Sequence, residues 1–162
     1  MSRAFVKEND TGPAADLPEL PLSPHPNYVT ARGLAQLRAR LAAAEARARG
    51  ELDPAERAHV EREMRWLAAR VESAMVLTPG GGPLDEVGFG MWVELADADD
   101  RRHRYRIVGE DEADPERGLI SHVSPLARAL RGARVGETRV WPRPAGDLEV
   151  EVLAIGADAP PG

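Results

Sequence analysis

The segment from Ile107 to Gly136 constrains the fold of this chain more than any other. It reads IVGEDEADPERGLISHVSPLARALRGARVG. A first strand ends in an acidic turn, and a second short strand follows. Ser124 and Pro125 then supply the cap and the first position of a helix, which Gly132 ends. A small sheet with one helix across a face is an α+β arrangement, and we predict that fold class.

Two further pairs of strands flank this segment. Residues 91–95 and 104–108 carry alternating apolar side chains and are joined by a polar turn, so we predict a hairpin. Residues 138–141 and 148–155 alternate in the same way around a turn that contains Pro144 and Gly146. We expect all four to belong to one small sheet.

Two amphipathic helices are predicted upstream of the sheet. Thr30 is a suitable N-cap for the first, which ends at Gly50. Asp53 and Glu56 form a capping box around Pro54 at the start of the second. Each helix repeats apolar side chains at spacings of three and four: Leu34, Leu37, Leu41, Ala44 and Ala48, then Val60, Met64, Leu67, Val71 and Ala74. We therefore predict an N-terminal antiparallel coiled-coil hairpin with helices about 30 Å long.

Composition divides the chain into five predicted segments. Residues 1–27 form a Pro-rich leader that we expect to be extended or disordered, because it has little periodic apolar pattern. The hairpin occupies residues 28–77, and a Gly/Pro linker occupies residues 78–86. The C-terminal domain covers residues 87–156, and residues 157–162 form a flexible tail.

Composition also excludes several kinds of site. The chain has no cysteine, so it has neither disulfides nor thiolate zinc ligands. Its four histidines are scattered and none is at metal-ligand spacing, so we expect no metal site and no cofactor. A net charge of −6 disfavours independent binding to duplex DNA, and we expect nucleic-acid contact only through a protein partner.

No apolar run approaches the roughly 20 residues that span a bilayer, and the N-terminal residues lack the apolar core of a signal peptide. We therefore expect a cytoplasmic protein without membrane contact.

The run from Ile107 onward resembles the C-terminal domain of the bacterial Gre transcript-cleavage factors, the GreA/GreB type of transcription elongation factor. The family pattern reads approximately I-V-G-x-D-E-A-D, then I-S, then S-P-x-A-x-A-L-x-G, and Glu137 stands here where a later Asp is usual. Residues 28–33, Tyr-Val-Thr-Ala-Arg-Gly, are similar to the opening of the Gre coiled coil. The resemblance covers roughly residues 28–156. It implies that the C-terminal domain has an FKBP-like antiparallel sheet with one short helix.

The resemblance also implies a partner, the core of RNA polymerase. The family's C-terminal domain grips the rim of the polymerase secondary channel while the coiled coil projects inward. The residues that match the docking surface are Asp111, Glu112, Asp114, Ser124 and Pro125. These residue types are also common in turns and helix caps, so a local structural role is the competing interpretation.

At the hairpin tip of the family, two acids help to hold a second Mg²⁺, and the polymerase then hydrolyses its own backtracked transcript. In the matching run, Glu51 replaces the first acid and Pro54 takes the place of the second. Asp53 or Glu56 could supply a carboxylate, but the capping box already explains both. The hairpin is also shorter than a typical Gre hairpin by roughly 10 residues per arm, or about 15 Å of reach.

We therefore predict an RNA polymerase-binding regulator of transcription elongation that has a shortened coiled coil and no catalytic residues of its own. The alternative is a transcript-cleavage stimulator that uses Glu51 with Asp53 or Glu56 and polymerase-bound Mg²⁺. A prolyl isomerase would need an aromatic-lined pocket, for which the region offers only Phe89, Trp92, Tyr105 and Trp141.

Overall fold

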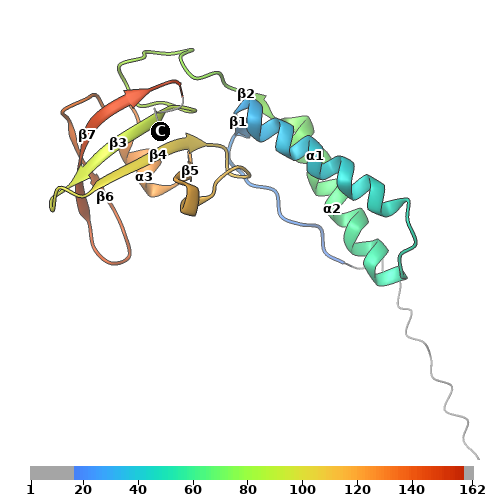
Figure 1. Ribbon diagram of the computed structural model, residues 1–162. Coiled ribbons are helices and arrows are strands. Elements are labelled where there is room, and N and C mark those ends of the chain that lie inside the picture. The colour runs from blue at the N-terminus through green and yellow to red at the C-terminus, as the bar shows by residue number, and fades with distance from the viewer. Residues whose placement is uncertain (1–16, 159–162) are drawn as a thin grey trace, which may run out of the picture.

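The computed structural model describes residues 17–158, and these form a helical arm attached to a globular lobe (Figure 1). The arm consists of α1 (Ala31–Ala48) and α2 (Pro54–Ser73), which lie side by side and are joined by a short loop. The Thr30 side chain caps α1 by accepting a hydrogen bond from the Gly33 amide. Both helix starts therefore lie where their capping residues predict them.

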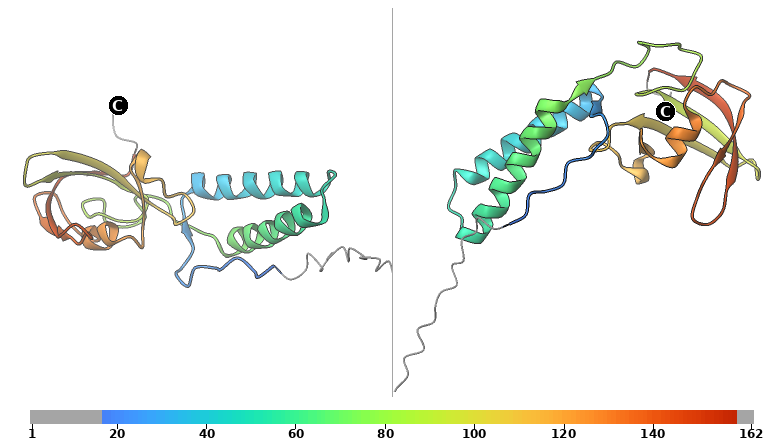
Figure 2. Two further views of the ribbon diagram at one scale, coloured as in Figure 1. Left: turned by 90° about the horizontal axis from the view of Figure 1, so that it is seen from below. Right: turned by 180° about the vertical axis from the view of Figure 1, so that it is seen from behind.

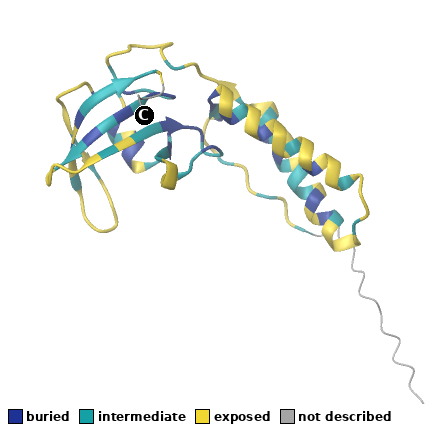
Figure 3. Cartoon of the chain, in the orientation of Figure 1, coloured by how far each residue is buried: buried dark blue, intermediate teal, exposed yellow. Residues whose placement is uncertain are grey.

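The two helices bury the apolar stripes that face each other. Leu37 and Ala44 of α1 and Val60 and Leu67 of α2 are buried, whereas the outer faces are exposed (Figure 3). The predicted apolar spacing is thus confirmed as the packing seam of the arm. At its base, the two-residue strands β1 (Tyr28–Val29) and β2 (Met75–Val76) pair in parallel. The sequence did not predict this pair, because two residues are too short to show a period.

The globular lobe is a five-stranded sheet with one helix across it, which confirms the predicted α+β class. Its strands are β3 (Trp92–Asp97), β4 (Arg102–Val108), β5 (Leu119–Ser121), β6 (Thr138–Trp141) and β7 (Leu148–Gly156), in the order β5-β4-β3-β7-β6. All neighbours are antiparallel except β4 and β5, which are parallel, so the predicted antiparallel sheet is wrong at this edge. A single turn of 3-10 helix, η2 (Pro115–Arg117), lies between those two strands in the chain.

The core of the lobe lies between the sheet and α3 (Pro125–Leu130). Inward-facing residues of β3 and β7 alternate with exposed or half-buried ones, as expected for a sheet with one covered face. The fully buried members of this core are Val93, Leu95, Leu130, Ala133, Val150 and Val152.

Residues 17–26 run extended beside α2 (Figure 2). Arg62 donates to the Pro18 carbonyl, the Trp66 indole donates to the Pro21 carbonyl, and Arg65 pairs with Glu19 at 2.7 Å. The sequence predicted an extended or disordered leader, and its described part is extended and held by side chains of α2. The rest of the predicted leader, residues 1–16, lies outside the described residues.

Between residues 17 and 158, no helix is both long enough and apolar enough to cross a membrane.

Candidate functional site

The two sequence motifs that define the resemblance meet in space at the junction of arm and lobe. Arg70 of α2 is 3% exposed, and its guanidinium donates to Asp111 Oδ2 and to Asn27 Oδ1, each at 2.7 Å. The Asn27 amide in turn donates to the Arg70 carbonyl at 2.8 Å. Arg70 therefore ties the start of the arm and the end of α2 to the acidic turn of the lobe.

Glu112 makes a second connection across the same junction. Its side chain is 5% exposed, accepts a hydrogen bond from the Thr30 hydroxyl and lies 3.5 Å from the Arg32 guanidinium. We call Asn27, Thr30, Arg70, Asp111 and Glu112 the interlobe cluster. Because buried carboxylates are costly to leave unpaired, the cluster strongly favours one orientation of the arm.

Two glycines allow the arm and the lobe to approach each other this closely. A Cβ on Gly33 would come within 2.9 Å of Glu112 Oε1. A Cβ on Gly109 would collide with the Tyr28 carbonyl oxygen. At Gly109 the obstacle is backbone, so only glycine fits there without movement of the main chain, whereas at Gly33 a Cβ would displace the buried Glu112 carboxylate. The glycines of both motifs thus serve the contact between arm and lobe.

The residues predicted to bind a partner fall into two groups, those with partners inside the chain and those nearer the surface. Asp111 and Glu112 point into the interlobe cluster and have partners within the chain. Ser124 caps α3, because its hydroxyl accepts from the Ala127 amide at 3.3 Å, and Pro125 beside it is exposed. Asp114 is half-buried at the start of η2, where its carboxylate makes no capping hydrogen bond. Asp114 and Pro125 are therefore better placed to meet a partner than the two preceding acids.

The tip of the arm carries the other predicted candidates. Glu51, Asp53 and Glu56 are all exposed. The Glu56 amide donates to the Asp53 side chain at 2.8 Å, and the Asp53 amide donates to the Glu56 carboxylate at 3.2 Å. The predicted capping box is thus confirmed. Arg57 completes the tip by donating to the Ala48 carbonyl at the end of α1.

No group of three or more His, Asp or Glu side chains within residues 17–158 is arranged to hold a metal ion. At the tip, two of the three acids already serve the backbone, so only Glu51 is left without a local structural role. A carboxylate that coordinates an ion would therefore have to act with groups outside residues 17–158.

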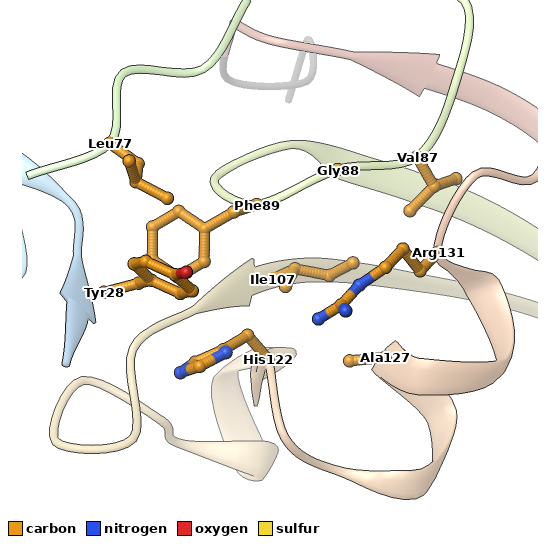
Figure 4. A pocket seen from close by; sticks show the side chains of 9 residues that line it. All are labelled: Tyr28, Leu77, Val87, Gly88, Phe89, Ile107, His122, Ala127 and Arg131. Atoms are coloured by element: carbon orange, nitrogen blue, oxygen red, sulfur yellow. The ribbon is translucent and has the colours of Figure 1, made fainter. Parts of the chain in front are cut away.

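A pocket lies between the base of the arm and α3 (Figure 4). Tyr28, Phe89 and His122 line one side of it, with ring centroids 5.3–6.0 Å apart. Burial holds the pKa of His122 below its usual range, with an opposing effect of the Glu110 carboxylate. The Nε2 atom of His122 is buried and has no hydrogen-bond partner among the described residues.

Sequence reasoning did not single out this pocket. Four aromatic residues were considered for a prolyl isomerase pocket, and of these only Phe89 lines this pocket. Tyr105 and Trp141 pack edge to face with each other, with ring centroids 6.2 Å apart. Tyr28 and His122 come from distant segments, one from β1 and one from the turn after β5. Their pairing leaves no periodic signal in the sequence.

The structure defines a class of two-part protein, in which a helical arm projects from a small α+β lobe. The interlobe cluster connects the two parts. A family model described as the C-terminal part of the transcription elongation factors GreA and GreB matches residues 82–157. The chain is 39% identical to the transcription elongation factor GreA of Acidiphilium cryptum over 123 residues, which are 70% of this chain and 78% of that protein. The chain therefore belongs to the GreA/GreB family.

Other relatives match over different lengths. The GreA of Alkalilimnicola ehrlichii is 34% identical over 150 residues, covering 78% of this chain and 95% of that protein. The match to the GreA of Nitratiruptor is 37% identical and spans only 61% of that relative's length. Among solved structures, GreA factor homolog 1 of Thermus thermophilus is 26% identical over 81% of this chain and 99% of its own, and its TM-score of 0.40 is too low to support an argument.

Proposed function

We propose that the protein regulates transcription elongation by binding RNA polymerase with its lobe while its arm enters the secondary channel. Family membership supports this role, since the relatives are named transcription elongation factors. The observation that carries the proposal is the interlobe cluster. Arg70 and Glu112 hold the arm at one orientation to the lobe, and a protein that acts by inserting an arm requires such a fixed orientation.

The docking surface that we propose is centred on Asp114, Ser124 and Pro125. These residues lie at the turn after β4 and at the start of α3. Asp111 and Glu112 belong to the proposed mechanism in a different way, because they orient the arm from within the protein. From membership of the GreA/GreB family we also propose two finer structural features: the helix pair is a coiled coil, and the lobe is FKBP-like. It also retains the proposed division into hairpin, linker and C-terminal domain.

The length of the arm sets what it can do inside the channel. With 18 residues, α1 is about 27 Å long at 1.5 Å per residue. This is shorter than the arm that the family resemblance implies. We therefore propose that the arm modulates elongation by occupying the channel instead of completing the catalytic centre of the polymerase.

The alternative is that the arm stimulates transcript cleavage. The three exposed acids at the tip favour it, and Glu51 is the one among them that the capping box does not use. In this alternative, the Glu51 carboxylate would help to hold an Mg²⁺ ion of the polymerase and activate a water molecule.

Two assays separate these possibilities. The first measures binding of the full chain to core RNA polymerase. Asp114→Ala should weaken binding, whereas Glu116→Ala, an exposed acid in the same turn, should not. Equal binding by wild type and both variants would remove Asp114 from the docking surface, and no binding at all would end the proposal.

The second assay measures transcript shortening on backtracked complexes. If the arm only occupies the channel, wild type and Glu51→Gln should give the same amount of cleavage as polymerase alone. Cleavage that wild type stimulates and Glu51→Gln loses would establish the alternative. Glu51→Gln is suitable because the side chain is exposed and lies outside the capping box.

A further inference from the structure

The pocket between the arm and α3 has the properties of a small-molecule site. Its volume is about 330 Å³, at the lower end of the range of ligand pockets in proteins. Its lining is predominantly apolar and comes from three parts of the chain (Figure 4). The arm contributes Tyr28, the segment before β3 contributes Leu77, Val87, Gly88 and Phe89, and the lobe contributes Ile107, His122, Ala127 and Arg131.

The aromatic side chains favour a compact apolar occupant. Tyr28 and Phe89 meet edge to face at 6.0 Å, and His122 lies 5.3 Å and 5.6 Å from them. This leaves ring surface and the Ile107 side chain toward the pocket (Figure 4). Flat or branched apolar groups pack well against such a lining.

Two nitrogen-bearing side chains in the pocket bear on the chemistry of the ligand. The guanidinium of Arg131 lines the pocket, its residue is exposed, and no ion pair within residues 17–158 uses it. His122 is 5% exposed, and its buried Nε2 has no hydrogen-bond partner in the part of the chain that the structure describes. Buried polar atoms in proteins nearly always have a hydrogen-bond partner, and exceptions concentrate at functional positions.

We propose that this pocket binds a small anionic molecule with a compact apolar body, of the class of aromatic or branched-chain carboxylates. The anionic group pairs with Arg131, since guanidinium and carboxylate match each other in charge and geometry. The apolar body packs against Tyr28, Phe89 and Ile107. The His122 ring packs beside Tyr28 and Phe89 and completes the wall of the pocket.

A ligand in this place would contact both parts of the protein. Tyr28 belongs to β1 at the base of the arm, whereas Ile107 and Ala127 belong to the lobe. Occupancy would therefore add contacts across the same junction that the interlobe cluster holds. This inference does not rest on the polymerase role, because it concerns only groups within the chain.

The test uses the full chain, labelled with ¹⁵N, and two probes of the same shape. Benzoate carries the anionic group, and benzamide is its neutral counterpart. We expect benzoate to cause saturable shifts of the Phe89, His122 and Ala127 amides and to bind about tenfold more tightly than benzamide, as expected for one charge-assisted pair.

Variants at the C-terminal end of α3 identify the anion-binding group. Arg131→Gln, at the C-cap, should remove the preference for benzoate, whereas Arg128→Gln, an exposed arginine in the last turn of α3, should keep it. Leu77→Trp, at an exposed position on the pocket wall, should weaken both probes. The proposal is overturned if neither probe gives saturable shifts at the pocket, or if Arg131→Gln binds benzoate as wild type does.

Discussion

Removing the buried arginine of the interlobe cluster should destabilise the protein far more than removing an exposed one from the same helix. Arg70 and Arg65 both lie on α2, and each pairs with a carboxylate at 2.7 Å. The side chains of Arg70 and Asp111 are 4% and 14% exposed, whereas those of Arg65 and Glu19 are 54% and 63% exposed. The two pairs therefore differ in burial, and Arg70 also donates to Asn27 Oδ1.

Breaking a buried pair by removing one partner costs about 3–5 kcal/mol, because the other charge stays buried and unpaired. Asp111 keeps some contact with water, so we expect Arg70→Met to lower the free energy of unfolding by about 2–4 kcal/mol. Arg65→Met should lower it far less, because the Arg65–Glu19 pair is exposed to water on both sides.

Urea denaturation of both variants measures these losses. Asp111→Asn and the double variant with Arg70→Met complete a double-mutant cycle, for which we expect a coupling energy of at least about 1 kcal/mol. The reasoning is refuted if Arg70→Met and Arg65→Met lose similar amounts of stability. It is also refuted if the losses in free energy of unfolding caused by Arg70→Met and Asp111→Asn simply add in the double variant.

Arg70→Met also tests whether the interlobe cluster orients the arm. The chain has no cysteine, so spin labels can be placed at Ala55→Cys near the tip and Thr138→Cys on the lobe, both exposed positions. The distance distribution between the labels should be narrow in an otherwise wild-type chain and broader with Arg70→Met. A distribution unchanged by Arg70→Met would mean that other contacts hold the arm.

Three further changes should follow from the structure. Gly109→Ala should cost about 2 kcal/mol or more in urea denaturation, since its Cβ would meet the Tyr28 carbonyl, whereas Gly82→Ala, which faces open space, should cost little; equal losses would contradict this. Asp53→Ala removes the N-cap of α2 and should cost about 1 kcal/mol, measured in the same way; an unchanged midpoint would show that the cap contributes nothing. The pKa of His122 is lowered in the folded protein, so the unfolded state binds more protons below about pH 6.5. Stability should therefore fall as the pH drops from 7 to 5, and His122→Gln should flatten that dependence; equal slopes for the two proteins would contradict the assignment.

Local chemistry decided much of the fold. The Thr30 cap, the capping box of Asp53 and Glu56, and the Ser124 cap each involve residues three positions apart, so the sequence alone predicts them. The apolar spacing of the helices and the alternation of the strands likewise predicted the arm, the sheet and the α+β class. In each case the signal comes from neighbours in the chain, and long-range packing then followed the pattern.

The candidate site depended on contacts that no local pattern encodes. Arg70 lies 41 residues from Asp111, and Thr30 lies 82 residues from Glu112. From sequence, the acidic turn looks like an exposed docking surface, because turns are normally solvated. Only the tertiary structure shows that two of its carboxylates point inward. Asp111 accepts a hydrogen bond from the buried Arg70 guanidinium, and Glu112 accepts one from the buried Thr30 hydroxyl. The pocket beside His122 arises in the same way, because its walls come from three segments that lie far apart in the chain.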